Sequence, residues 1–261
     1  MEKTLIENEI DRGQLMRDYW EEYLHDYVLD ENYWFSYNIN QNTCKRLHSP
    51  FLNHDWFLSD EEMNLHNPKK NAIHRKNMFK KEIKSESIID VRYAISLVEK
   101  NSRTIFLYEH FLKSGNADKF SDIDVWSVIS YVWVSTEFNC GTTDGANGWR
   151  EIFSHRSRPR ELVQELPEKI TLFRGGHRKG FSWTPDIEVA KSFQARTANW
   201  FARHVQSDDA NQVELLTMTV GRDDILFKGE RENELVLDPY SMDYYFRNNQ
   251  FQVLGAMETK R

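Results

Sequence analysis

The chain has 261 residues, of which 39% are hydrophobic and 29% charged, and its formal net charge is −7. Such a composition is ordinary for a soluble globular protein, and the acidic balance argues against broad electrostatic attachment to nucleic acid. No apolar run is long enough to span a bilayer, and the first residues lack a secretion signal, so we expect no membrane partner. Cys44 and Cys140 are far apart, without zinc or disulfide spacing, which favours a cytoplasmic location.

Residues 1–115 are expected to form a helical region that contacts a substrate or a partner. Residues 9–28 carry apolar and aromatic side chains at helical spacing, which predicts an amphipathic helix. From residue 29 to 58 that periodicity is lost, and we expect irregular structure with short turns. Residues 88–112 predict two helical segments with a break near Asn101 and Ser102.

A run of basic residues between Lys69 and Lys84 interrupts this otherwise acidic chain. Three interpretations stay open. The run is a solvated loop or helix face, a surface that guides an acidic macromolecule, or a nucleic-acid contact without a recognisable binding motif.

Residues 121–137 predict a buried helix, because Ser121 is a typical N-cap, acids follow in the first turn, and apolar residues lie on almost every face. The glycine-rich stretch 141–148 is expected to be a loop, and residues 148–155 one more short helix.

After Pro167 the pattern changes to short β-type runs, and residues 116–261 are expected to form one domain. Strands are predicted at 169–174, 180–184, 213–220, 224–227, 235–237 and 251–255, with a helix at 185–204. That helix is predicted to begin with Thr184 as cap and Pro185 in its first position. The fold class is therefore α+β, a compact mixed β structure crossed by one or two helices.

Two segments of this half combine residue types that suit chemistry. Arg174 ends an apolar run beside Gly175 and Gly176, where a ligand can approach the backbone closely, and its guanidinium suits phosphate or carboxylate. Glu232 and Glu234 are two residues apart in a predicted strand, which would place both carboxylates on one face.

Ser182 and Thr184 also share a face of a predicted strand and could orient a carboxylate, with Trp183 between them pointing into the core. A phosphate-binding arginine, an orienting serine and paired carboxylates suit cleavage of a glycosidic bond in a phosphorylated sugar. A carboxylate on the sugar 2-hydroxyl stabilises the oxocarbenium-like transition state, and the second carboxylate acts on the nucleophile.

The motifs LFRGG, FSWTPDIEVAKSF and ENELVLDP, in this order, resemble the three signatures of mono-ADP-ribosyltransferases, in the arginine–serine–glutamate branch that includes bacterial toxins and phage enzymes. The resemblance covers residues from about Trp126 to the C-terminus. It implies an ADP-ribosyltransferase-like β-sandwich core, NAD as co-substrate, a macromolecular acceptor and a possible neutralising antitoxin or immunity partner. The middle motif departs from the commoner Ser-Thr-Ser at its second and third positions.

The resemblance also implies roles for individual residues. Arg174 would hold the NAD phosphates and the nicotinamide ribose, and the Gly175 backbone would meet the nicotinamide amide. Ser182 would orient Glu234, the catalytic residue on the ribose 2′-hydroxyl, while Glu232 would face the acceptor.

The remaining implications concern the surroundings of this site. Phe193 would stack near the nicotinamide, and residues 222–231 would form the loop that reads the substrate. A glutamate two residues before the catalytic one is associated in this family with arginine acceptors, so protein arginine is the leading expectation. A nucleic-acid base, an NAD glycohydrolase and a non-catalytic binding protein on the same scaffold remain alternatives. The histidines form no H-x-x-x-H or H-x-H pair, so no metal is expected.

Overall fold

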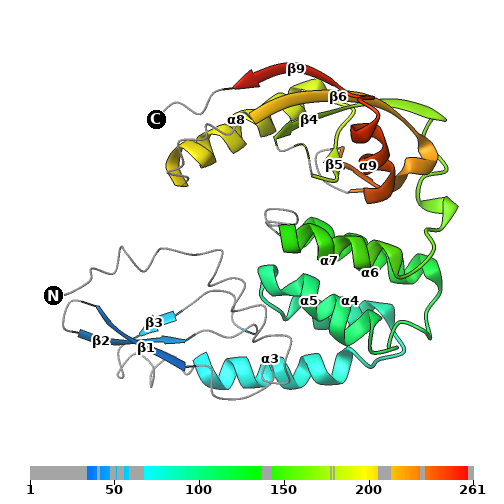
Figure 1. The fold of residues 1–261 in the computed structure, drawn as a ribbon. Coiled ribbons are helices and arrows are strands. Elements are labelled where there is room, and N and C mark those ends of the chain that lie inside the picture. Colours follow the sequence, from blue (N-terminus) through cyan, green and yellow to red (C-terminus); the bar gives the residue numbers. More distant parts are fainter. Residues whose placement is uncertain are drawn as a thin grey trace. The chain divides into compact units, whose positions relative to one another are not determined.

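The computed structural model describes residues 34–39, 42–47, 51, 56–58, 68–136, 143–176, 178, 180–204, 213–229 and 233–257. The chain divides into two compact units, residues 1–116 and 117–261 (Figure 1). Helices and antiparallel sheets occur together, so the fold class is α+β. None of the helices in these ranges is long and apolar enough to cross a membrane.

The first unit contains a three-stranded antiparallel sheet where we expected irregular structure. Its strands are β1 (Trp34–Ile39), β2 (Asn42–Leu47) and β3 (Trp56–Leu58), in the order β1-β2-β3. The prediction was wrong because it looked for helical periodicity, whereas FSYNI, residues 35–39, alternates apolar and polar residues with period two and the strand is rich in aromatic residues. The helix predicted at 9–28 lies outside the described residues.

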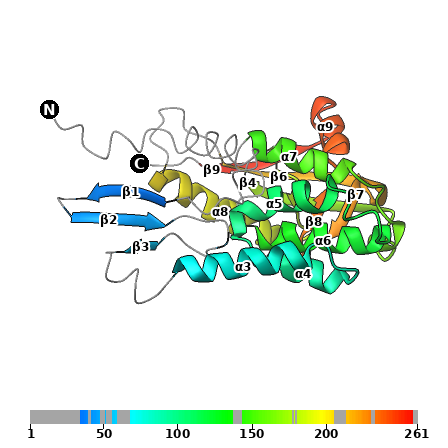
Figure 2. The ribbon, with the colours of Figure 1, turned by 90° about the horizontal axis from the view of Figure 1, so that it is seen from below.

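The helices of the first unit lie after residue 67 and include the two helical segments predicted at 88–112. They are α3 (Pro68–Glu82), α4 (Ile88–Ser96), the 3₁₀ turn η3 (Lys100–Ser102), α5 (Arg103–Leu107) and the π-helical turn η4 (Tyr108–Leu112). The break near Asn101 and Ser102 is confirmed. Helices α3 and α4 pack against each other (Figure 2). Arg75 on α3 donates to the carbonyl oxygen of Leu97 at 2.6 Å, beyond the end of α4.

In the second unit, α6 (Asp122–Ser135) and α7 (Thr143–Ser154) pack through a cluster of aromatic rings. The predicted Ser121 cap and the burial of α6 are confirmed. Helix α7 begins at Thr143, so the loop predicted at 141–148 was wrong from residue 143 on, and the short helix predicted at 148–155 is the second part of α7. Trp149, Ile152 and Phe153 are buried along one face of α7. This packing outweighs the low helix propensity of the glycines.

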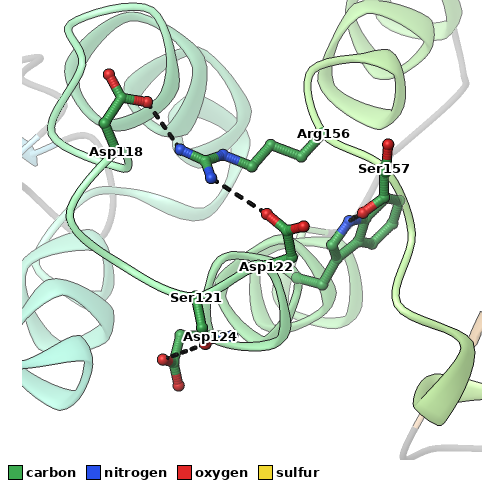
Figure 3. Close-up of polar contacts among 7 residues, drawn as sticks. Asp118, Ser121, Asp122, Asp124, Arg156 and Ser157 are labelled. Atoms are coloured by element: carbon green, nitrogen blue, oxygen red, sulfur yellow. Dashed lines mark hydrogen bonds and ion pairs between the residues drawn. The ribbon is translucent and has the colours of Figure 1, made fainter.

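Arg156 fixes the chain that follows α7 to the beginning of α6 (Figure 3). Its guanidinium pairs with Asp118 at 2.7 Å and with Asp122 at 3.1 Å. Close by, the indole nitrogen of the buried Trp126 donates to the carbonyl oxygen of Ser157 at 3.1 Å.

Two small antiparallel sheets follow. The first contains β4 (Lys169–Gly176), β6 (Val213–Gly221) and β9 (Gln252–Met257), in the order β4-β6-β9. Helix α8 (Ile187–His204) packs against this sheet (Figure 1). Strand β4 follows the 3₁₀ turn η5 (Arg160–Leu162).

The second sheet contains β5 (Ser182–Trp183), β8 (Leu235–Leu237) and β7 (Ile225–Lys228), in the order β5-β8-β7. The strands predicted from the sequence are confirmed, with shifted ends. Helix α9 (Pro239–Arg247) was not predicted from the sequence, although Asp238 as N-cap and Pro239 in the first helical position are standard signals for the start of a helix.

Two further local predictions in this unit were wrong. Asp186, not Thr184, caps α8, because its side chain accepts from the backbone of Glu188 at 2.8 Å and the helix begins only at Ile187. The substrate-reading loop predicted at 222–231 is regular over its first seven residues. These form the 3₁₀ turn η6 (Arg222–Asp224) and strand β7, because the apolar ILF segment is buried.

Candidate active site

The three motif segments lie on three neighbouring strands. Phe173 of β4 and Thr184 after β5 exchange two backbone hydrogen bonds, of 2.7 and 2.9 Å, so β4 runs beside β5. Strand β5 in turn pairs with β8, with Ser182 opposite Val236. Arg174, Ser182 and Glu234 are thus each within two residues of these pairings, although 60 residues of chain separate the first from the last.

The guanidinium of Arg174 is held against the backbone of the next segment. Its Nη1 donates to the carbonyl oxygen of Ser182 at 2.5 Å. A Cβ atom on Gly180 would lie 1.8 Å from Nη2 of Arg174 and 2.1 Å from its Cζ. Only glycine at position 180 therefore leaves the arginine in this place, and Gly180 is a site residue that the sequence analysis missed.

Gly175 lies between β6 and α8. It pairs with Leu215 of β6, and an added Cβ would approach the carbonyl oxygen of Ala190 to 1.9 Å and the backbone nitrogen of Gln194 to 2.5 Å. The glycine thus lets the helix approach the strand closely. Gly175 and Gly176 both belong to β4, which extends two residues beyond the strand predicted at 169–174, and the contact of Gly175 with nicotinamide stays a prediction.

Glu234 stands immediately before β8, and its carboxylate is contacted from two sides. The Oε1 atom accepts a hydrogen bond of 2.9 Å from the indole nitrogen of Trp133 on α6. The Oε2 atom would lie 2.7 Å from a Cβ on Gly229, whose backbone nitrogen donates to the carbonyl oxygen of Glu234 at 2.8 Å. Glu234 is half-buried and Trp133 is buried, so the carboxylate is fixed from the protein interior.

The extended run predicted across Glu232 and Glu234 was too long. Asn233 has a φ of 51°, in the left-handed region, and the strand begins only at Leu235. A simple alternation of side chains therefore does not pass through Asn233. Glu232 lies outside the described residues, and its place beside the acceptor stays a prediction.

The middle motif behaves as expected in one respect. Trp183 is buried and its ring lies 6.5 Å from that of Phe246 on α9, which confirms that it points into the core. Ser182 is half-buried, and its carbonyl oxygen accepts from Arg174. The hydrogen bond that the structure shows on the Glu234 carboxylate comes from Trp133, and the orienting role of Ser182 stays a prediction.

Phe193 lies on α8, where the guanidinium carbon of Arg196 stands 4.1 Å from the centre of its ring. One face of this ring is therefore in a cation–π contact. Its stacking near nicotinamide stays a prediction.

A second arginine, Arg178, follows β4 and forms a two-pronged ion pair with Glu214 of β6. Hydrogen bonds from Arg178 lower the pKa of the Glu214 carboxyl below its usual range. The Arg178 guanidinium also lies 5.3 Å from the ring centre of Phe251. This pair ties the segment between β4 and β5 to the sheet, close to Gly180.

Trp133 and Gly229 could not be assigned to the site from the sequence. Trp133 lies 101 positions before Glu234, on a helix whose apolar pattern predicts only that Trp133 is buried. That prediction is correct, but it does not indicate the hydrogen bond to Glu234. The hydrogen-bond partner of the Trp133 indole N–H cannot be predicted from the spacing of residues in the sequence. The ENELVL pattern likewise contains nothing that points to Gly229.

The site offers a permanently charged guanidinium on β4 and a half-buried carboxylate immediately before β8, and both of these strands lie beside β5. These groups suit a ligand that carries phosphates on one part and a sugar hydroxyl on another. Within the described ranges, no group of three histidine, cysteine or acidic residues could hold a metal ion.

Comparison of the chain with protein-family models, with curated proteins and with solved structures found no match.

Proposed function

We propose that the protein is a mono-ADP-ribosyltransferase that cleaves NAD between nicotinamide and ribose and transfers ADP-ribose to a macromolecular acceptor. The observation that carries the proposal is the adjacency of β4, β5 and β8, with Arg174 bonded to Ser182 and Glu234 at the start of β8. Three motifs that are separate in the sequence are thereby linked through β5, by its bridge to β4 and its pairing with β8.

The chemistry assigns a distinct task to each charged group. Arg174 neutralises and positions the NAD phosphates. Glu234 accepts a hydrogen bond from the ribose 2′-hydroxyl, which stabilises positive charge as the bond from C1′ to the nicotinamide nitrogen breaks. The bonding electron pair leaves with nicotinamide. A nucleophilic nitrogen of the acceptor then bonds to C1′ and gives up a proton, which Glu232 is proposed to take.

Protein arginine is the leading acceptor. This assignment depends on the position of Glu232, two residues before Glu234, and on the family resemblance. In this scheme the Glu232→Ala variant loses transfer to protein while it still hydrolyses NAD. Equal losses of transfer and hydrolysis would contradict the division of roles.

The test uses the full chain, NAD labelled in its adenylate part, and a cell extract. We expect the wild-type protein to label macromolecules and release nicotinamide, and the Glu234→Gln variant to lose at least about a hundredfold in both rates. Glu188→Gln, an exposed acid on α8, is the matched control and should keep both rates. Undiminished transfer by Glu234→Gln would refute the mechanism.

A nucleic-acid base is the second candidate acceptor, and α3 is the observation that favours it. The helix is markedly basic, and exposed positions recur at helical spacing along one side, at residues 70, 74, 77 and 81 and, two residues beyond its end, at 84. Three of these positions are lysines and one is a histidine, and the exposed Lys80 is adjacent. Ala72 and Phe79 on the opposite face are buried, as is Ile83 beyond its end, so no apolar face is left for a lipid surface.

Digestion of the labelled extract separates the two acceptors. Label released by protease identifies protein, and label released by nuclease identifies nucleic acid. If the acceptor is nucleic acid, reversing the charge of Lys70, Lys80 and Lys81 should weaken its binding about tenfold or more and flatten the salt dependence. The same change at Lys119, Lys169 and Lys191, all exposed, is the control with matched net charge.

Two other outcomes would identify other functions. Full release of nicotinamide without any labelled macromolecule would identify an NAD glycohydrolase. Failure of the wild-type protein to bind NAD at all would indicate a non-catalytic binding protein.

A further inference from the structure

We infer that Trp133 is a positioning residue for Glu234, so that an indole N–H on a buried helix sets the orientation of the reactive carboxylate. This inference rests on the proposed function for its catalytic part. The contact between the indole nitrogen and Oε1, at 2.9 Å, is a property of the folded protein and does not depend on that function.

The donor itself is fixed by packing. Trp133 is 2% exposed, and its ring centre lies 4.8 Å from that of Trp149, 5.6 Å from Phe153 and 6.4 Å from Phe227. A ring enclosed in this way has one rotamer, and its N–H therefore has one direction. The donor is placed before any ligand arrives, which is what positioning of a reactive group requires.

The acceptor is confined from the other side by Gly229. Because a Cβ there would come within 2.7 Å of Oε2, the carboxylate fits only while position 229 has no side chain. The backbone of Glu234 is restricted as well. Its carbonyl oxygen accepts a hydrogen bond from the backbone nitrogen of Gly229, and β8 begins at the next residue. One oxygen of the carboxylate is thus held by the indole, and the other lies beside Gly229.

The same helix provides a matched control. Trp126 is also buried, lies two turns before Trp133, and donates its indole N–H to a backbone carbonyl, that of Ser157, at 3.1 Å. The two tryptophans share helix, burial and hydrogen bonding, and they differ in whether the acceptor is the Glu234 side chain. Losses that come only from packing should therefore be similar at both positions.

The first experiment requires no enzymatic activity. The protein has eight tryptophans, and labelling their indole nitrogens with ¹⁵N gives one N–H resonance per residue. The Trp133→Phe variant identifies the Trp133 resonance. We expect Glu234→Gln to shift this resonance and to leave that of Trp126 in place, whereas Glu188→Gln shifts neither. An unshifted Trp133 resonance in Glu234→Gln overturns the inference.

The second experiment measures the role in catalysis without creating a cavity. Benzothienylalanine at position 133 replaces the indole N–H by sulfur and keeps the bicyclic shape. We expect kcat for nicotinamide release to fall about tenfold to a hundredfold with little change in KM for NAD. The same replacement at position 126 should leave kcat near the wild-type value. Equal losses at both positions, or an unchanged kcat at 133, would overturn the positioning role.

The two experiments also separate the inference from the proposed function. If Glu234→Gln keeps full activity, the proposed mechanism fails, while a shifted Trp133 resonance would still establish the contact. If Glu234→Gln is inactive and the benzothienylalanine protein is fully active, the proposed function stands and the positioning role alone is refuted.

Discussion

Arg174 and Glu234, two charged groups of the candidate site, are held in different ways. Arg174 is held by backbone, since its guanidinium bonds to the carbonyl oxygen of Ser182 and lies against Gly180. Glu234 is held by a side chain from a distant helix, the indole of Trp133. A carbonyl is present whatever the residue at 182, whereas the indole N–H is lost with any substitution of Trp133. The position of the Arg174 guanidinium should therefore tolerate side-chain substitutions at residue 182. The position of the Glu234 carboxylate should not tolerate substitution of Trp133.

Substitution of glycine by alanine at three positions tests these contacts one at a time. Gly175 faces the backbone of α8, Gly180 faces the tip of Arg174, and Gly229 faces the carboxylate of Glu234. An added methyl group meets rigid backbone in the first case and a movable side chain in the other two. The first change should affect folding, and the others should affect function.

Gly175→Ala is expected to have the largest effect. Its Cβ would lie 1.9 Å from the carbonyl oxygen of Ala190, so α8 must move away from β4. We expect a loss of about 3 kcal/mol in the free energy of unfolding, measured by urea titration. Gly148→Ala on α7 is the control, since an added Cβ would meet no described atom within 4 Å beyond its chain neighbours and its own helix backbone, and helix propensity should raise stability by about 0.5–1 kcal/mol. A similar stability for the two variants would contradict the close approach of α8.

Gly180→Ala should separate binding from stability. The new methyl group would overlap Nη2 and Cζ of Arg174, and the flexible arginine can move away at a cost of about 1 kcal/mol or less in stability. NAD affinity, measured by calorimetry, is expected to fall about tenfold because the guanidinium leaves its place. An unchanged affinity in a folded variant would show that this placement of Arg174 does not matter for NAD.

Gly229→Ala should have a smaller effect and on a different parameter. The methyl group would press on Oε2 of Glu234 and turn the carboxylate away from Trp133. We expect nicotinamide release to slow several-fold, up to about tenfold, while NAD affinity stays near the wild-type value. A loss of affinity with an unchanged rate constant would reverse the roles that we assign to the two ends of the site.

The smallest effect is expected from the ion pair between Arg178 and Glu214. The pKa of Glu214 is lowered by hydrogen bonds from Arg178, so the pair stabilises the fold above the pKa of the unfolded state and loses this contribution as the pH falls through the folded value. Because Arg178 is 51% exposed, solvent screening keeps the contribution below about 1 kcal/mol.

We therefore expect the wild-type protein to lose slightly more stability than Glu214→Gln between pH 5 and pH 3, measured by urea unfolding. Glu188→Gln, whose partner Lys191 is also exposed, should follow the wild-type curve. Parallel losses in wild-type protein and Glu214→Gln would show that the pair contributes nothing to stability in acid.

The parts of the fold that the sequence predicted well are those in which one local signal is strong. Helix α6 has a serine cap, acids in its first turn and a nearly continuous apolar surface, and its prediction was correct. Strands β6 and β8 are short apolar runs with clear ends, and they too were found where expected. Local pattern and tertiary burial agree in these segments.

One error, at α7, occurred where tertiary packing overrides a local signal. Helix α7 extends through glycines because Trp149 and Phe153 are buried against α6, which no window of residues reports. Asp186 and Thr184 are both suitable caps, and only the observed start at Ile187 distinguishes them. The sequence motifs single out Arg174, Ser182 and Glu234, whose roles in a site stay predictions, whereas no motif indicates the long-range contact of Trp133 with Glu234.

The most direct test of the central claim is a crystal structure of the protein with carba-NAD, an analogue that resists cleavage. The account predicts the analogue's phosphates at Arg174 and its nicotinamide-side 2′-hydroxyl about 2.6–3.2 Å from the carboxylate of Glu234, with the bond from Trp133 retained. A dinucleotide bound elsewhere, or a 2′-hydroxyl turned away from Glu234, would contradict it.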